Sequence, residues 1–294
     1  MAEWLQWDWI HLALEIGGSL LLFTLLRFSQ GWWEGVSSQK ELAERDNVAF
    51  GISTAGSLLA MALVISSVMP RQGHLSYTQQ GINLIVFGLI GLLLIRVSLW
   101  VNDRFAINRI DKKQHILSGN VAMALTDASA ALSAAFIIQA LLTKLHQAPS
   151  LMGVVSYGLI YIASLVMLTG ISHWMQRLHD RNGYGPFQQA IEQDQRSVAL
   201  NHSGVVIACS LIMSASVYLP DVGVNQPLTL LWSWFGFALG GLLLLTLWQR
   251  LLSAWVMIKI NPDREIALQD NSGIAALEAA QWVGVALLLS AMID

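Results

Sequence analysis

The sequence has few charged residues. Only 12% of its 294 residues are Asp, Glu, Lys or Arg, whereas a soluble globular domain carries about 25%. At the same time 55% of the residues are hydrophobic and the mean hydropathy is +0.55. Because this deficit of charge runs along the whole chain, it excludes an ordinary cytosolic enzyme and an intrinsically disordered protein.

Basic charge, cysteine and catalytic motifs are also scarce. The net charge is −3, so the chain has no basic field to attract nucleic acid, and we expect no nucleic-acid partner. The single cysteine, Cys209, lies in an apolar run and cannot form a disulfide or a Cys-based metal site within one chain. The sequence has no phosphate-binding loop, dinucleotide fingerprint, nucleophile elbow or metalloprotease motif. We therefore expect no enzymatic activity, no cofactor and no metal.

Long apolar runs take the place of the missing charge. A helix needs about 20 apolar residues to cross a bilayer, whereas a membrane barrel shows alternating segments of about ten residues. Eight runs have the length for a helix, at about 9–29, 48–69, 80–101, 120–143, 151–175, 198–219, 228–249 and 271–293. The sequence thus predicts an all-α polytopic membrane protein with eight transmembrane helices.

The basic residues predict the orientation of these helices. Of the 16 Lys and Arg residues, 14 lie in or beside the loops that follow the first, third, fifth and seventh spans. Only Arg71 and Lys144 lie on the other side. Since basic loops stay in the cytoplasm, we expect four cytoplasmic loops and both termini outside.

The chain repeats at a spacing of about 75 residues. The segment 41–47 before the second span matches the segment 265–271 before the eighth. Each unit consists of an odd helix, a charged loop and an even helix, and because each unit crosses twice, all units point the same way. Two units make one half, so we expect two tandem four-helix modules at residues 1–147 and 150–294, each of two parallel helix-pair repeats.

Two kinds of residue recur at the loop ends of the helices. Asn and Ser are good N-caps, and the four even helices are expected to begin at Asn47, Asn120, Ser197 and Asn271. One arginine stands near the end of each odd helix, at Arg27, Arg96, Arg177 and Arg250. These arginines either extend to the lipid headgroups or form an anion or lipid site with the helix N-termini.

The even spans are rich in Gly, Ala and Ser, as at Gly56 in the second span and 128–131 in the fourth. Small side chains let helices approach closely in lipid. We therefore place the even helices in the bundle interior and the odd helices nearer the lipid, and we expect a homo-oligomer.

The residues most informative about function are Asp127 and Glu278. Each lies seven residues past its cap, roughly 10 Å into the membrane at about 1.5 Å per residue. The second and sixth spans carry Thr54 and Gly204 at this depth. An intramembrane carboxylate costs about 2.5–3.5 kcal/mol, so the two acids either bind a cation, relay protons or form interhelical hydrogen bonds as neutral acids.

Two motifs resemble a known bacterial family. Glu41-Leu42-x-x-Arg45-Asp46-Asn47-Val48-Ala49 precedes one small-residue span, and Leu94-x-Arg96 through Asn102-Asp103-Arg104 precedes a second Asn-Val span. Both are similar to the YjfL-like, four-span inner-membrane family known as domain of unknown function 350. The resemblance covers nearly the whole chain as two copies, of which the first is the better match because Ser197 replaces a cap Asn in the second.

This resemblance also bears on function. Family members usually carry an acid after the Asn-Val start of a module's last helix, and Asp127 and Glu278 match that position. The family has no established activity. Its relatives occur beside phage-shock-type, membrane-remodelling coat proteins and glutathionylspermidine-synthetase-like enzymes, which implies a bacterial inner membrane and either envelope maintenance or polyamine biology.

Two functions are compatible with these observations. The first is a non-enzymatic inner-membrane protein, with periplasmic termini, that anchors or regulates a cytoplasmic partner such as a coat-type protein in envelope stress or membrane maintenance. Its four loops of mixed charge, such as the segment 40–46, would make the contact. The second is a channel or transporter for a cation, a proton or a polyamine, with Asp127 and Glu278 as the acids that bind the transported species.

Overall fold

The computed structural model describes residues 9–34, 37–69, 76–147 and 149–293, and in these residues it contains helices but no strand. The eight long helices are α1 (Trp9–Glu34), α2 (Val48–Ser66), α3 (Tyr77–Val101), α5 (Val121–Gln147), α6 (Leu151–Arg181), α8 (Arg196–Ala215), α9 (Pro227–Val256) and α11 (Ser272–Ala291). Five short helices lie in the loops: η2 (Lys40–Glu44), η3 (Asn102–Ala106), α4 (Lys112–Leu117), α7 (Phe187–Glu192) and α10 (Pro262–Gln269).

The long helices make this a multi-pass membrane protein. In the described part of the chain, seven helices are long and apolar enough to cross a bilayer, namely α2, α3 with η3, α5, α6, α8, α9 and α11. The first predicted run forms the 26-residue helix α1, which is not among those seven. The all-helical membrane fold is thus confirmed, and the count of eight spans stays a prediction.

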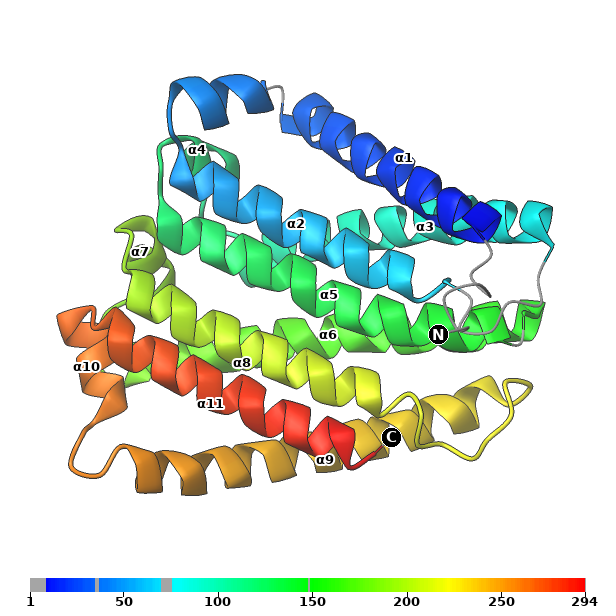
Figure 1. The fold of residues 1–294 in the computed structure, drawn as a ribbon. Helices are drawn as coiled ribbons and strands as arrows, with labels where there is room; N and C mark the ends of the chain where they lie inside the picture. Colours follow the sequence, from blue (N-terminus) through cyan, green and yellow to red (C-terminus); the bar gives the residue numbers. More distant parts are fainter. Residues whose placement is uncertain (1–8, 35–36, 70–75, 148, 294) are drawn as a thin grey trace, which may run out of the picture.

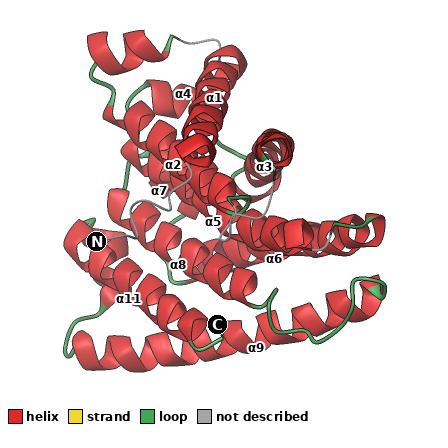
Figure 2. Ribbon diagram, turned by 45° about the vertical axis from the view of Figure 1, so that its right-hand side comes forward, coloured by secondary structure: helices red, strands yellow, loops and turns green. Residues whose placement is uncertain are grey.

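The helices lie in two layers (Figures 1 and 2). The even helices α2, α5, α8 and α11 run side by side in chain order, each in contact with the next. The odd helices lie against them, with α3 touching α2 and α5, α6 touching α5 and α8, and α9 touching α8 and α11. α5 packs against α8 as extensively as it packs against α2, so the array runs on past the boundary predicted between residues 147 and 150.

Small residues explain the close packing of the even helices. A methyl group added at Gly56 of α2 would lie 2.5 Å from the Cβ of Ala128 in α5. One added at Gly204 of α8 would lie 2.5 Å from the Cβ of Ala279 in α11. In the most apolar segments, 72% of α5 and 78% of α8 are buried, but only 22% of α9. Two of the even helices therefore form the interior, because only small side chains let their backbones meet.

A residue with positive φ directly precedes the N-cap of each even helix. Three of the four caps are as the sequence predicts: the side-chain oxygens of Asn47, Asn120 and Asn271 accept the amides of Phe50, Met123 and Ile274 at 3.0, 2.7 and 3.2 Å. The preceding residues are Asp46, Gly119, Asp194 and Asp270, with φ of 49°, 89°, 59° and 47°.

The prediction that Ser197 caps an even helix is wrong. α8 begins at Arg196 and its N-cap is Gln195, because the chain leaves the α7 turn at Asp194, which has φ of 59°. Ser197 lies inside the first turn, and its hydroxyl donates to the Ile266 carbonyl at 2.7 Å. Equivalent positions in α8 are therefore counted from Gln195.

Hydrogen bonds at the loop end join each helix pair to the next. Going forward along the chain, the side chains of Asn47, Asn120 and Ser197 donate to the carbonyls of Ile116, Ile191 and Ile266 at 3.1, 2.8 and 2.7 Å. Going backward, the carboxylates of Asp194 and Asp270 accept the amides of Ala122 and Ser197 at 2.8 and 2.9 Å. The four loops therefore form one bonded rim, which fixes the depth at which the side chains of neighbouring even helices face each other.

Candidate functional site

Asp127 projects from α5 into a contact with two other elements. Its side chain is 6% exposed, and its Oδ1 lies 2.9 Å from the Lys112 Nζ of α4. The Ser53 hydroxyl of α2 donates to its other carboxylate oxygen. The carboxylate thus bridges α2, α4 and α5 by interhelical bonds. It does so in an ion pair, and not as the neutral acid that the sequence leaves open for such bonds.

Lys112 holds a second acid as well. Its Nζ lies 2.5 Å from the carboxylate of Asp103 in η3. Burial lowers the pKa of Lys112, but Asp127 and Asp103 together raise it more, so that the pKa of this amine lies above its usual value. Lys112 is therefore protonated at neutral pH, and its positive charge compensates the negative charge beside it.

This counter-ion is not predicted from the sequence, in which Lys112 counts only as one of the basic residues that predict the orientation. Lys112 and Asp127 are 15 residues apart and lie in different helices, α4 and α5. No helical periodicity links two such positions, so only the fold of the loop shows the pair.

Glu278, the matching acid in α11, has different surroundings. The segment before α11 carries Asp263 and Arg264, and no salt bridge to Glu278 forms among the described residues. The Oε2 atom of Glu278 is buried without a hydrogen-bond partner of normal geometry, and the Gln249 side chain lies close enough to interact with the carboxyl group. Glu278 lines a cavity of about 530 Å³ at the loop end of the bundle, together with Asp263 and residues of α6, α7, α8 and α9.

Unpartnered polar atoms gather around this cavity. Five buried side-chain atoms without a hydrogen-bond partner belong to residues that line it: Glu278 Oε2, Gln249 Nε2, His202 Nδ1, His179 Nε2 and Asn201 Oδ1. His202 and Gln249 are only 4% and 3% exposed. Buried polar groups in folded proteins are nearly always satisfied, so such a gathering at one cavity indicates that a ligand or water completes the bonding.

His202 lies at the same level in the bundle as the two acids. Counted from the N-caps, the seventh residue of each even helix is Thr54, Asp127, His202 and Glu278. The prediction that Gly204 stands at this depth is therefore wrong, because it was counted from Ser197. The His202 Nε2 lies 3.0 Å from the Ser172 hydroxyl of α6. The other ring nitrogen, Nδ1, is therefore the one that can bond to a ligand in the cavity.

Aromatic rings form much of the cavity wall. Trp174, Tyr184, Phe187 and Trp282 line it. The Phe187 ring packs on the His202 ring with a centroid distance of 5.1 Å. The charged groups at the cavity are Glu278, Asp263 and Arg250, so the acids outnumber the single arginine.

The four arginines near the ends of the odd helices do not come together. Arg27, Arg177 and Arg250 are exposed, and Arg96 is half-buried, each on a different helix. Only Arg250 borders the cavity. At the starts of α5 and α8, one amide each, of Ala122 and Ser197, already donates to Asp194 and Asp270. Within the described residues, no group of three or more His, Cys, Asp or Glu side chains could hold a metal ion.

Comparison with known families gives a match over the whole bundle. The Domain of Unknown Function family DUF350 matches residues 4–142, 76–217 and 185–293. This chain belongs to the DUF350 family. The three matches overlap, and the second begins 72 residues after the first (76 against 4), which is about the spacing of one helix pair. The first two matches to this DUF350 protein each span two helix pairs and are offset by one pair, consistent with tandem copies. No curated protein and no solved structure matches the chain.

Proposed function

We propose that this DUF350 protein is a non-catalytic membrane protein that binds an amine-bearing organic cation in the cavity beside Glu278. The observation that carries the proposal is the set of five unpartnered polar atoms around one cavity. The proposal narrows the hypothesis of a cation, proton or polyamine transporter to one acid, because Lys112 already compensates Asp127.

The unpaired carboxylate of Glu278 favours a cation. A partly buried carboxyl group without a counter-ion is costly to ionise, and an ammonium group placed beside Glu278 would remove that cost. Asp263 adds a second negative charge at the same cavity. Gln249 and His202 offer polar atoms that can orient the rest of the ligand.

The size and walls of the cavity favour an organic cation over a bare ion. A volume of about 530 Å³ lies within the range of about 300–1,000 Å³ that small-molecule sites have. Trp174 and Trp282 border the same space, and aromatic rings attract ammonium groups to their faces. A bare Ca²⁺ or Mg²⁺ ion would instead need several oxygen ligands close together.

The basic residues support access from the cytoplasm. The cavity lies at the end of the bundle that carries η2, α4, α7 and α10, and the loops at this end hold most of the Lys and Arg residues. By the positive-inside rule this end faces the cytoplasm of a bacterial inner membrane. The ligand would then be a cytoplasmic amine, such as a polyamine.

Calorimetry on the purified full-length protein tests the proposal. Putrescine and spermidine are titrated at constant ionic strength into wild type, Glu278→Gln and Glu15→Gln. Glu15 in α1 accepts a hydrogen bond from Gln80 at 2.8 Å and does not line the cavity, so it controls for the loss of an intramembrane acid. We expect the amines to bind wild type and Glu15→Gln alike, and Glu278→Gln at least tenfold more weakly. Absence of binding, or equal binding by Glu278→Gln, contradicts the proposal.

Transport is a separate step beyond binding. Uptake of spermidine into liposomes that contain the protein, compared with empty liposomes, distinguishes a transporter from a binding protein. A transporter that uses this site loses uptake in Glu278→Gln and keeps it in Glu15→Gln.

The anchoring of a cytoplasmic partner is a second candidate function. It is supported by the ordered rim at the loop end, where hydrogen bonds hold the loops in one arrangement and Lys40, Glu44 and Arg45 are exposed. Purification in mild detergent, followed by identification of bound proteins, tests this function. A partner that stays bound to wild type and is lost when these three side chains are neutralised supports anchoring, and its retention counts against it.

A further inference from the structure

The contacts between even helices follow one register. Counted from the N-cap, the ninth residue of one helix meets the eighth residue of the next, as Gly56 meets Ala128 and Gly204 meets Ala279. The Asp with positive φ that precedes an even helix accepts a hydrogen bond from the backbone amide of the second residue of the previous even helix in the chain. Each even helix therefore has two different faces. The receiving face packs against the previous even helix in the chain, and the second face packs against the next even helix.

Among the described residues, no even helix packs against this second face of α11. Its second and ninth residues after the cap, Gly273 and Ala280, are exposed, as is Ala276 between them. Gly284 continues the same row, and a methyl group there would meet nothing within 4 Å. Of the most apolar segment of α11, only 28% is buried, against 78% for α8, which has an even helix on each side.

The composition of this face differs from that of the loop half of α9. Toward its loop end, the exposed side of α9 consists of large side chains such as Leu243, Leu247 and Trp255, whereas Gly236 and Gly240 are exposed in its other half. In α11 the row of Gly and Ala lies at the loop end itself, with Leu277 exposed beside it, and such small residues favour close contact between helices in a membrane.

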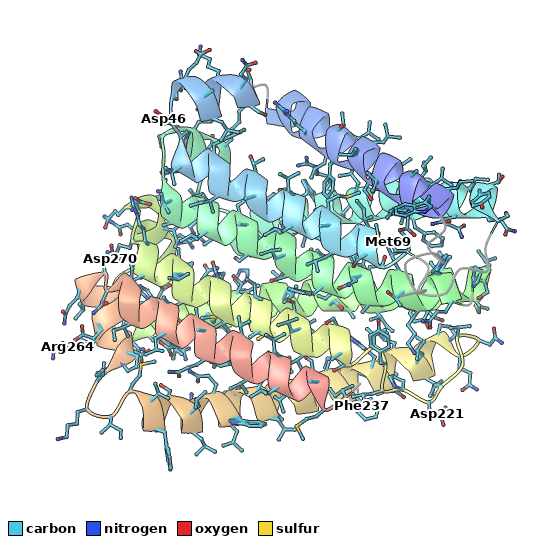
Figure 3. All side chains as sticks on the ribbon, viewed as in Figure 1. Asp46, Met69, Asp221, Phe237, Arg264 and Asp270 are labelled. Atoms are coloured by element: carbon cyan, nitrogen blue, oxygen red, sulfur yellow. The ribbon has the colours of Figure 1, made fainter. Side chains whose placement is uncertain are left out.

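α2 has the receiving face, but no even helix comes before it in the chain to pack against that face. Its eighth residue after the cap, Ala55, is exposed, whereas the equivalent residues Ala128 and Ala279 contact the previous even helix. Asp46 before it has φ of 49°, as Asp194 and Asp270 have 59° and 47°. The Asp46 carboxylate is exposed and accepts no hydrogen bond from the rest of the described chain. Figure 3 shows Asp46 and Asp270 at the same end of the bundle.

We infer that a second copy of this chain docks head to tail, with α11 of one copy against α2 of the next. In the internal register, Ala280 lies opposite Ala55 of the next copy, and the Gly273 amide donates to the Asp46 carboxylate of that copy. One turn further on, Gly284 lies opposite Leu59. Because the two faces differ, the contact is heterologous and continues into a ring or a chain in the plane of the membrane. The inference does not depend on what the cavity binds.

Cysteine cross-linking in native membranes tests this contact. In a Cys209→Ala background, Ala280→Cys and Ala55→Cys are made in separately tagged chains and oxidised with copper phenanthroline. We expect a cross-linked dimer only when both variants share a membrane, and a ladder of higher species when both changes are in one chain. As a control, Leu243→Cys in α9 replaces Ala280→Cys and is expected to give no dimer.

Three outcomes overturn the inference. Dimers from Ala280→Cys alone would indicate a symmetric contact, no cross-link in the mixture would indicate no contact, and equal cross-linking by Leu243→Cys would indicate random collision. If either variant fails to accumulate, the pair Gly284→Cys and Leu59→Cys reports the same register.

The role of Asp46 is tested in the same assay. Asp46→Gly keeps the positive φ, as Gly119 does at the equivalent position, and removes the carboxylate. We expect a severalfold lower cross-link yield than in Glu44→Gln, which changes an exposed acid nearby. An equal yield in the two variants overturns the role assigned to Asp46.

Discussion

Lys112 and Asp127 form an ion pair with 2.9 Å between Nζ and Oδ1, although the lysine lies in a loop and the acid in a buried helix. The short helix α4 brings the amine to the carboxylate, and Asp103 shares it. Glu278 stands at the matching position of α11 without such a partner. The two acids therefore match in sequence position but differ in electrostatic environment, and this difference is the reason why the proposed ligand site uses Glu278 and not Asp127.

The first prediction is that removal of Lys112 destabilises the protein more than removal of the Asp127 charge. Lys112→Met leaves a carboxylate that is 6% exposed without a counter-ion, at a cost on the order of 3 kcal/mol. Asp127→Asn keeps a hydrogen-bond acceptor for Ser53, and Lys112 keeps Asp103. We expect its cost to be about 1 kcal/mol. Thermal unfolding in detergent measures both.

The double variant provides the control. If the ion pair is the cause, Lys112→Met combined with Asp127→Asn is more stable than Lys112→Met alone, since no charge is left unpaired at Asp127. Additive losses in stability would contradict this explanation.

The second prediction concerns alkaline pH. The folded pKa of Lys112 is raised above the ordinary value of 10.5, since the neighbouring acids outweigh burial. Stabilisation from this amine is therefore fully present below about pH 10.5 and is lost as the pH rises through the higher folded pKa. We expect the stability difference between wild type and Lys112→Met to be constant from pH 7 to 10 and to shrink above that range. A difference that already shrinks near pH 8 would mean a lowered pKa.

The sequence is sufficient to predict the membrane class and the helical fold. Long apolar runs and the small residues of the even spans are local patterns, and the described structure has long helices there. The Asn caps at 47, 120 and 271 are also local, because each is decided by one side chain beside a helix start.

The cavity could not be predicted in this way. It depends on the register of α8, which Asp194 shifts by two residues relative to the alignment on Ser197. Because of that shift, the sequence does not show that His202 occupies the position equivalent to Asp127 and Glu278. The role of Gln249 cannot be predicted from the sequence either. A lone amide in an apolar span becomes informative only when the structure shows that its Nε2 atom has no partner.

The third prediction concerns the contact between α2 and α5. A methyl group at Gly56 would lie 2.5 Å from the Cβ of Ala128 and 2.6 Å from its Cα, so the backbones must separate. We expect Gly56→Ala to cost about 1–3 kcal/mol. Gly158→Ala in α6 is the control, because its methyl group would meet nothing within 4 Å, and we expect no loss of stability there. Equal melting temperatures of the two variants would contradict the close contact.

The fourth prediction separates ligand binding from folding at Gln249. Its Nε2 is buried without a partner, so Gln249→Leu removes an unsatisfied group and is expected to leave thermal stability unchanged or higher. Binding of spermidine is expected to weaken severalfold, since the amide lines the cavity with Glu278. Gln176→Leu in α6 is the matched change, because the Gln176 Nε2 donates to the Ala106 carbonyl at 2.9 Å and its loss leaves that carbonyl only the longer 3.5 Å hydrogen bond from Gln188. We expect Gln176→Leu to lower the melting temperature. A stability loss in Gln249→Leu as large as in Gln176→Leu would show that the Gln249 amide serves the fold and not a ligand.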